Sequence, residues 1–315
     1  MAVYTQVSAE ALATFLTRYE GVGELVSAKG IAEGVENSNY LVDTTAGRYI
    51  LTLYERRVEA GDLPFFMALL DHLAARGLPV PPAIKDRDGV AIQTLAGRPA
   101  CLIRFLPGVS LTRPSPIQAH TAGAALADLH VAVADFDGNR PNSLGVTAWR
   151  PLLERCGADL DAIAPGLFAR VDAALARLEA AWPHDLPACV IHADLFPDNV
   201  LMLDAQVTGL IDFYFACCDL RAYDLAVMHT SWGFDPAGAP LDGVGAALMK
   251  GYGDRLSPAE RAAMPVLARG ACIRFLLTRA WDWLNTPADA LVTRKDPLAY
   301  LRRLDWYDAH PEAFA

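Results

Sequence analysis

The sequence predicts an α+β protein with two domains, in which a sheet-rich N-terminal part precedes a larger, mainly helical part. Most of the strand-like runs lie between residues 25 and 106, and helical periodicity dominates from Ser115 onward. The chain has 315 residues, of which 53% are hydrophobic, so it is long enough to form two hydrophobic cores. We therefore predict one domain over residues 1–106 and a second over residues 107–315.

The N-terminal domain is predicted to combine an antiparallel sheet with helices. Ser8 is expected to cap a helix over residues 8–19, and Asp62 a helix over residues 63–76 that ends at Gly77. Runs of β-branched and aromatic residues predict strands at 25–32, 39–43, 49–54, 90–95 and 100–106. Tight turns at 44–47 and 96–99 join neighbouring strands, so these neighbours run antiparallel.

The second domain is predicted to consist mainly of helices. Ser115 and Pro116 begin the first, and His130 falls on its apolar stripe, where a packed core histidine is expected. Residues 138–149 are expected to form a loop. Further helices are predicted at about 166–181, from Tyr223, from the capping box at 257–260 through residue 284 with a break considered near Pro265, and from residue 296 onward.

Polar residues next to three short apolar runs make residues 189–219 the most informative stretch. The runs at 188–191, 200–203 and 207–211 are predicted to be buried strands. Asp194 lies between the first two, Asn199 follows it by five residues, and Asp212 comes directly after the third. We therefore expect two carboxylates and one amide to converge at the mouth of a hairpin.

These three residue types match the needs of phosphoryl transfer from a nucleoside triphosphate. The reaction requires a carboxylate that orients the acceptor hydroxyl and takes its proton, and Asp194 is predicted to fill this role. It also requires hard oxygen ligands for magnesium, which Asn199 and Asp212 are predicted to supply. The ordered pattern H-x-D-x-x-x-x-N followed by I-D-F is specific, although each part is common alone. His192 is expected to brace the loop by hydrogen bonds.

The sequences HADLFPDNVLM and GLIDFYFA resemble the catalytic and metal loops of the aminoglycoside phosphotransferase and choline kinase superfamily. The resemblance implies a two-lobed protein-kinase-like fold, with an antiparallel sheet and a helix in the N-terminal lobe and a larger, mainly helical C-terminal lobe. It also implies ATP as the phosphate donor and Mg²⁺ as a cofactor. Asp224 matches an aspartate that holds the catalytic loop by hydrogen bonds in these relatives, so we expect a supporting role for it.

The turn at residues 30–39, GIAEGVENSN, is the predicted phosphate-binding segment of the N-terminal domain. Its glycines allow backbone N–H groups to approach phosphate oxygens, and Glu33 and Glu36 are expected to point away from them. The adenine ring is expected to lie against residues near the end of the last strand. The predicted nucleotide-binding residues are Gly34, Asn37, Ser38, Asn39, Ile103 and Phe105.

The third predicted strand has Thr52 where protein kinases carry a phosphate-binding lysine. Lys29, Arg56 and Arg57 are the nearby cations. The sequence leaves open which group neutralises the inner phosphates of the nucleotide in place of this lysine. The segments KGIAEGVENSNYLV and ILTLYERRVEAGDLPFF resemble the bacterial homoserine kinases of this superfamily, which also lack that lysine. This resemblance extends over nearly the full length and implies phosphorylation of L-homoserine to O-phosphohomoserine, a step of threonine biosynthesis.

An acceptor of this kind needs a cation for its carboxylate and an acid for its ammonium group. We expect Arg274 and Arg279 to bind the carboxylate and Asp198 or Asp219 the ammonium group. Tyr214 and Trp232 are expected either to line the acceptor pocket or to pack in the hydrophobic core, and the sequence favours neither position. Without the resemblance, the chemistry specifies only a hydroxyl of a small molecule.

Three other functions stay open. A kinase for choline, ethanolamine, methylthioribose or an aminoglycoside would share the catalytic residues but favour an acid-rich or aromatic pocket. A non-catalytic nucleotide-binding regulator would explain the missing lysine but would not need Asp194, Asn199 and Asp212 together. A metal-dependent hydrolase would use His192, Asp194 and Asp212, but the other histidines show no paired ligand spacing.

Composition limits the classes of binding partner and the cellular compartment that we expect for the protein. The net charge of −10 argues against nucleic acid and anionic membranes as partners. The six cysteines form no C-x-x-C pair, so we expect reduced thiols in a cytoplasmic protein. The first 16 residues lack the features of a signal peptide, and no apolar run is long enough to span a bilayer. The oligomeric state and the choice between ATP and GTP stay open.

Overall fold

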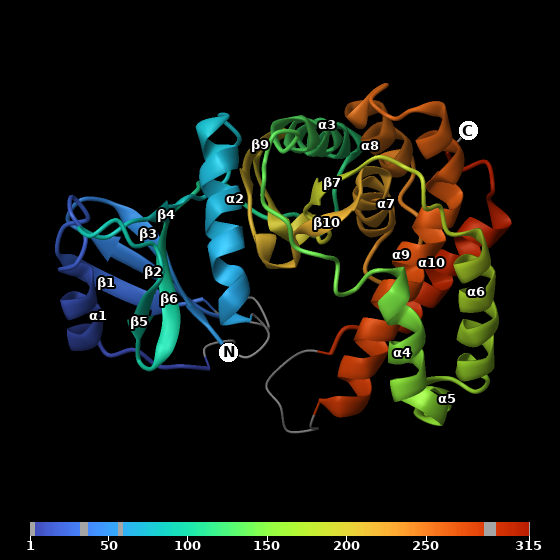
Figure 1. Ribbon diagram of the computed structural model, residues 1–315, viewed down its shortest axis with the longest axis horizontal. Helices are drawn as coiled ribbons and strands as arrows, with labels where there is room; N and C mark the ends of the chain where they lie inside the picture. Colours follow the sequence, from blue (N-terminus) through green and yellow to red (C-terminus); the bar gives the residue numbers. More distant parts are fainter. Residues whose placement is uncertain (1–3, 32–36, 56–58, 287–293, 315) are drawn as a thin grey trace. The chain divides into compact units, whose positions relative to one another are not determined.

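The computed structural model describes residues 4–31, 37–55, 59–286 and 294–314 of the chain (Figure 1). It divides into two compact units, Met1–Pro107 and Gly108–Ala315. Strands dominate the first unit and helices the second, so the predicted α+β class is confirmed. Among the described residues, no helix combines the length and the apolar character that a membrane crossing requires.

The described part of the first unit forms a six-stranded antiparallel sheet. The strands follow the order β1-β2-β3-β6-β4, and β5 pairs with β6. Their bounds are Leu25–Gly30 (β1), Asn37–Thr44 (β2), Arg48–Tyr54 (β3), Ala83–Ile84 (β4), Gln93–Leu95 (β5) and Arg98–Arg104 (β6). The short strand β4 was not predicted, because it directly follows a proline-rich segment at residues 79–82 that favours a stiff extended chain.

Helix α1, Ala9–Leu16, packs against one face of this sheet. The Ser8 side chain accepts a hydrogen bond from the Ala11 N–H at 3.2 Å, so the predicted cap is confirmed. Apolar residues of α1, including Leu12 and Phe15, are buried in one cluster with strand residues such as Leu51. Figure 1 shows α1 and α2 on either side of the sheet.

Helix α2, Leu63–Ala75, begins without the predicted cap. Asp62 makes no capping hydrogen bond, because it belongs to the 3-10 turn Ala60–Asp62 and has φ −86° and ψ −18°. A capping residue needs an extended backbone to aim its side chain at the first N–H groups. Pro64, in the first turn of α2, removes one N–H donor that would otherwise need a partner.

The second unit contains two short two-stranded antiparallel sheets among its helices. Strand β7, Ala188–Ile191, pairs with β10, Cys217–Leu220, and β8, Val200–Leu203, pairs with β9, Gln206–Leu210. The helices are α3 Pro116–Ala132, α4 Val146–Cys156, α5 Leu160–Ile163, α6 Leu167–Ala181, α7 Arg221–Trp232, α8 Val244–Tyr252, α9 Pro258–Asn285 and α10 Leu298–Ala309.

Two expectations about the helices of this unit were wrong. The loop expected over residues 138–149 ends earlier, since α4 begins at Val146 and continues through Pro151. Helix α9 runs through Pro265 without the break considered there. Proline weakens a helix interior locally, but both helices pack against other helices of the unit, and this packing compensates for one lost hydrogen bond. The capping box that starts α9 is confirmed, with Ser257 and Glu260 bonded reciprocally.

Glycines bring α3 and α8 into close contact. A Cβ atom at Gly251 would overlap the carbonyl oxygen of His120, and one at Gly123 would overlap that of Leu248. We expect Gly251→Ala to lower the free energy of unfolding by about 1–3 kcal/mol, because the helices must separate to accept the methyl group. Urea denaturation measures this loss.

Gly61→Ala is the matched control for this substitution. No atom lies within 4 Å of a Cβ at Gly61, so we expect a change below about 0.5 kcal/mol. Equal unfolding free energies for the two variants would contradict the close packing of α3 and α8.

Candidate active site

The loop over residues 192–199, which connects β7 to β8, carries the predicted base, Asp194, and one predicted magnesium ligand, Asn199. The side-chain amide nitrogen of Asn199 donates to the backbone oxygen of Asp194 at 2.8 Å and to its Oδ2 at 3.3 Å. Because the amide nitrogen faces Asp194, Oδ1 is the atom through which Asn199 can bind a ligand. The hydrogen bond to Oδ2 fixes the orientation of the Asp194 carboxylate.

Asp212 follows β9 and lies beside the 192–199 loop. The preceding residue, Ile211, donates its N–H to the Asn199 carbonyl at 3.0 Å and accepts a hydrogen bond from His192 Nε2 at 3.0 Å. Asp212 has φ 65° and ψ 55°, a left-handed conformation that aspartate tolerates better than most residues. The structure therefore brings Asp194, Asn199 and Asp212 together at the ends of β7, β8 and β9.

The surroundings of Asp194 raise the basicity of its carboxylate. Burial raises the pKa of the Asp194 carboxyl well above its ordinary value, the Arg274 guanidinium opposes this shift, and repulsion from Asp212 adds to it. A carboxylate with a raised pKa takes a proton more readily than a solvated one. The arrangement suits removal of a proton from a weakly acidic hydroxyl.

His192 uses both ring nitrogens within the protein. Nε2 bonds to the Ile211 carbonyl, and Nδ1 accepts a hydrogen bond from the Asp194 N–H at 3.3 Å. The side chain is fully buried, and burial lowers the pKa of the ring, which keeps it neutral. These contacts match the role predicted for His192, which is to hold the loop in place by hydrogen bonds. They leave His192 no nitrogen for a metal ion, which argues against the hydrolase alternative.

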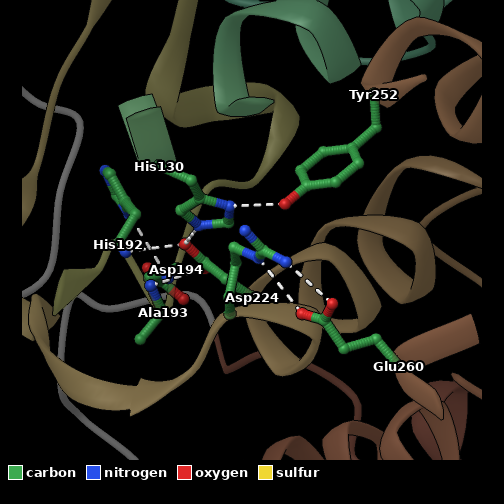
Figure 2. Close-up of polar contacts among 8 residues, drawn as sticks. His130, His192, Ala193, Asp194, Asp224, Tyr252 and Glu260 are labelled. Carbon is green, nitrogen blue, oxygen red and sulfur yellow. Dashed lines mark hydrogen bonds and ion pairs between the residues drawn. The ribbon is translucent and has the colours of Figure 1, made fainter. Parts of the chain in front are cut away.

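Asp224, on α7, holds the start of the loop (Figure 2). Its two carboxylate oxygens accept hydrogen bonds from the N–H groups of His192 and Ala193, each at 2.8 Å. Ala193 has a left-handed φ of 64°, so the loop backbone turns sharply at the residue before Asp194. Asp224 is fully buried and thus fixes the backbone from which Asp194 projects.

A histidine on α3 completes this network. His130 Nε2 lies 3.1 Å from Oδ2 of Asp224, and its Nδ1 lies 2.9 Å from the hydroxyl of Tyr252 on α8 (Figure 2). Burial alone would raise the pKa of Asp224, but the hydrogen bond and charge of His130 hold it below its ordinary value. The burial of His130 follows from its helical periodicity, but its partner was not predicted, since no local spacing relates positions 130 and 224.

Arg274 and Trp232 support the loop from α9 and α7. Arg274 is 2% exposed, and its Nη1 donates to the Ala193 carbonyl at 2.6 Å. Trp232 is fully buried, and its indole N–H donates to the Leu195 carbonyl at 2.9 Å. Such buried positions favour a supporting role over the substrate contacts predicted for both residues.

The remaining predicted acceptor residues lie in different environments. Asp198 is exposed, and one of its oxygens lies 3.8 Å from Lys295 Nζ. Both oxygens of Asp219 are engaged, by Asn142 Nδ2 at 2.6 Å and by the Leu220 N–H at 2.7 Å, so it is poorly placed to bind an ammonium group. Tyr214 is partly buried within the 3-10 turn Phe213–Phe215, and Arg279 is partly buried on α9.

The residues predicted to bind the nucleotide lie in the first unit. The described residues do not include Gly34, Glu33, Glu36, Arg56 or Arg57. Lys29 is exposed on β1. Ile103 and Phe105 are partly buried, at the end of β6 and just after it.

Three predicted phosphate-binding residues and Thr52 lie on the paired strands β2 and β3. Ser38 is fully buried, and its hydroxyl donates to Glu55 Oε1 at 2.7 Å, which commits it to the sheet. Asn37 Oδ1 accepts from the Glu55 N–H at 3.4 Å. Thr52, opposite Asn39, donates to its Oδ1 at 2.8 Å, so a neutral hydrogen bond occupies the expected place of the lysine.

A metal ion at this site would have few protein ligands. Among the described residues, no group of three or more His, Cys, Asp and Glu side chains is placed to hold one. Magnesium commonly keeps several waters and binds one or two protein oxygens beside substrate phosphates. The Asn199 amide oxygen and the Asp212 carboxylate fit this requirement.

Comparisons with a protein family and with individual relatives both identify phosphotransferases. The model of the phosphotransferase enzyme family matches residues 27–262. A homoserine kinase of Gluconobacter oxydans is 56% identical over 308 residues, covering 96% of this chain and 97% of that protein. A homoserine kinase of Xanthobacter autotrophicus is 54% identical over 311 residues, covering 98% of this chain and 97% of that protein.

Solved structures support the fold. Spectinomycin phosphotransferase, solved with ADP and spectinomycin, has a TM-score of 0.73 at 14% identity and covers 98% of this chain and 100% of its own. Choline kinase of Cryptosporidium parvum has a TM-score of 0.70 at 13% identity and covers 97% of this chain and 96% of its own. At such low identity these likenesses concern the fold alone. They confirm the predicted kinase-like architecture.

Proposed function

The chain belongs to the phosphotransferase enzyme family, and from this premise we propose that it transfers the γ-phosphoryl group of ATP to the side-chain hydroxyl of L-homoserine. The convergence of Asp194, Asn199 and Asp212 is the observation that carries the reaction type. Relatives that are 56% and 54% identical over almost their whole length are homoserine kinases, which supports homoserine as the acceptor. All six cysteines are free thiols, which suits the reducing cytoplasm in which we place the reaction.

Asp194 acts on the acceptor in the proposed mechanism. It accepts a hydrogen bond from the homoserine hydroxyl and takes its proton as the oxygen bonds to the γ-phosphorus. The bond between that phosphorus and the β–γ bridging oxygen breaks, and ADP leaves with the electron pair. Asn199 bonds to Oδ2 of Asp194 and thus directs Oδ1 toward the acceptor.

Asn199 and Asp212 are the proposed Mg²⁺ ligands. Bound Mg²⁺ would neutralise charge on the phosphates during transfer. The hydrogen bond from the Ile211 N–H to the Asn199 carbonyl keeps the two ligand-bearing segments adjacent. The chain's contribution is to fix the spacing between an amide oxygen and a carboxylate.

The unit Met1–Pro107 is the proposed nucleotide-binding lobe, and Gly108–Ala315 the catalytic and acceptor-binding lobe. Asn37, Asn39, Ile103 and Phe105 are the proposed ATP contacts among the described residues. With a Thr52–Asn39 hydrogen bond in place of the kinase lysine, Mg²⁺ has a larger share of the phosphate charge to neutralise.

A coupled assay of ADP release tests this function. Homoserine, serine, choline, ethanolamine and methylthioribose are compared at equal concentrations with saturating ATP and Mg²⁺. We expect homoserine to give the highest kcat/KM. A higher value for choline or ethanolamine would favour the other small-alcohol kinases. ATP binding without ADP release for any acceptor would favour the nucleotide-binding regulator.

Asp212→Asn is expected to raise the Mg²⁺ concentration for half-maximal activity by about 10- to 100-fold, because a neutral amide replaces a charged ligand. Activity at saturating ATP is measured across a magnesium titration. Asp242→Asn is the control, since this exposed aspartate lies outside the site. An unchanged magnesium requirement in Asp212→Asn would remove Asp212 from the ligand set.

A further inference from the structure

Arg279, on α9, is a partly buried cation that lacks a carboxylate partner within the described residues. Its Nη1 donates to the Asp296 carbonyl at 3.3 Å, and its guanidinium carbon lies 4.6 Å from the centre of the Tyr300 ring. A guanidinium has five N–H donors, so most of them have no partner in the described part of the protein. Burying part of a cation that has no ion-pair partner is costly, and a bound anion would offset that cost.

A row of aromatic rings connects this cation to the 192–199 loop. Phe196 of the loop lies 4.8 Å from Phe275, and Phe275 stacks on Tyr300 at 5.2 Å. Phe275 and Arg279 are four residues apart on α9 and therefore lie on one face of the helix. Arg279 thus lies on the side of α9 that faces the loop carrying Asp194.

Electrostatics agree with this placement. Burial lowers the pKa of Arg279, and the charges of Asp194 and Asp198 are near enough to oppose the shift. Arg279 therefore lies within electrostatic range of the proposed base.

Neighbouring cations are less suited to bind a ligand. Arg274 is 2% exposed and bonded to the Ala193 carbonyl, and Arg303 is 3% exposed and bonded to the Asp235 carbonyl. Lys295 is exposed and lies 3.8 Å from Asp198. Of these four described cations, Arg279 alone is partly accessible and has no ion pair.

We propose that Arg279 binds the carboxylate of the acceptor and so makes the enzyme select an amino acid over an amino alcohol. This inference rests on the proposed function and identifies the specificity residue of the same site. The planar guanidinium matches a carboxylate with two parallel hydrogen bonds, and the Tyr300 ring holds it in one orientation. Arg274, predicted from the sequence to share this task, instead supports the loop.

The test compares homoserine with 3-aminopropan-1-ol, which keeps the amine and the hydroxyl and lacks the carboxylate. We expect Arg279→Met to lower kcat/KM for homoserine by about 10- to 100-fold, which corresponds to the loss of charge-assisted hydrogen bonds. The change should lie mainly in the KM for homoserine. The kcat/KM for 3-aminopropan-1-ol and the KM for ATP should stay within about twofold, since neither involves Arg279.

Arg302→Met is the matched control, because it removes an exposed cation that pairs with the carboxylate of Asp296, the residue whose carbonyl accepts a hydrogen bond from Arg279. It should leave the preference for homoserine unchanged. Arg279→Lys keeps the charge without the planar fork and guards against misfolding of the methionine variant; partial retention of the preference is expected.

The outcomes distinguish the proposed role of Arg279 from the proposed homoserine kinase function. An equal loss for both acceptors in Arg279→Met, or full preference in both Arg279 variants, would overturn the role of Arg279 and leave the homoserine kinase function intact. A wild-type enzyme that fails to phosphorylate homoserine would overturn the proposed function itself.

Discussion

Asp194→Asn is expected to lower kcat by about 100- to 10,000-fold, the range that a positioned general base contributes. Asparagine keeps the shape of the side chain and can still accept the hydrogen bond from Asn199, but its amide has no useful basicity. The backbone of the 192–199 loop is fixed by Asp224 and Arg274, so the substitution should leave the site in place. The loss should therefore lie in the chemical step.

Single-turnover rates and nucleotide titrations separate the two effects. The dissociation constant for ATP should change less than about twofold, while the rate of phosphoryl transfer falls. Asp204→Asn is the control, because Asp204 is exposed in the β8–β9 turn and its φ of 55° is a conformation that asparagine also adopts. Turnover close to wild type in Asp194→Asn would exclude Asp194 as the base.

The core of the site was predictable because its residues are close in sequence. Asp194 and Asn199 lie five positions apart, and the next strand pair brings Asp212 back to the same end of the hairpin. Short apolar runs fix the strands, and the polar residues between them can only lie at the strand ends. The local pattern therefore determines the local geometry.

The supports of the site were less predictable because they come from distant segments. His130 and Asp224 are 94 positions apart, and Arg274 and Ala193 are 81 apart. Periodicity places His130 and Arg274 on buried helix faces, yet it does not show which backbone or side chain each will meet. Arg274 and Arg279 look alike in sequence, and only packing separates a buried support from a partly accessible cation.

The helix boundaries also divide into those that local sequence determines and those that it does not. Ser8 and Ser257 were recognised from their own side-chain chemistry, and both form the predicted caps. Asp62 has suitable chemistry but the wrong backbone conformation. Pro151 and Pro265 are local helix breakers, but the packing of α4 and α9 against each other overrides them. Tertiary contacts decided the cases in which local preference was weak or adverse.

Asp224→Ala is expected to lower the free energy of unfolding by about 3–5 kcal/mol, more than the loss expected for Gly251→Ala. The N–H groups of His192 and Ala193 would lose their acceptor in a buried place, and His130 would lose its carboxylate. Urea denaturation measures the loss. Faster amide exchange at His192 and Ala193 should accompany it.

The pH dependence of the same loss provides a second test. The pKa of Asp224 is below its ordinary value in the folded protein, so its stabilising contribution is complete above the unfolded value, about pH 3.9, and is lost as the pH falls through the lower folded value. The stability difference between wild type and Asp224→Ala should therefore shrink as the pH falls below about 4. Asp305→Ala, which removes an exposed partner of Arg170, should cost less than about 1 kcal/mol. If Asp224→Ala were as mild as this control, the buried carboxylate would not be what holds the loop, and the position of Asp194 would have to depend on Arg274 and Asn199 instead.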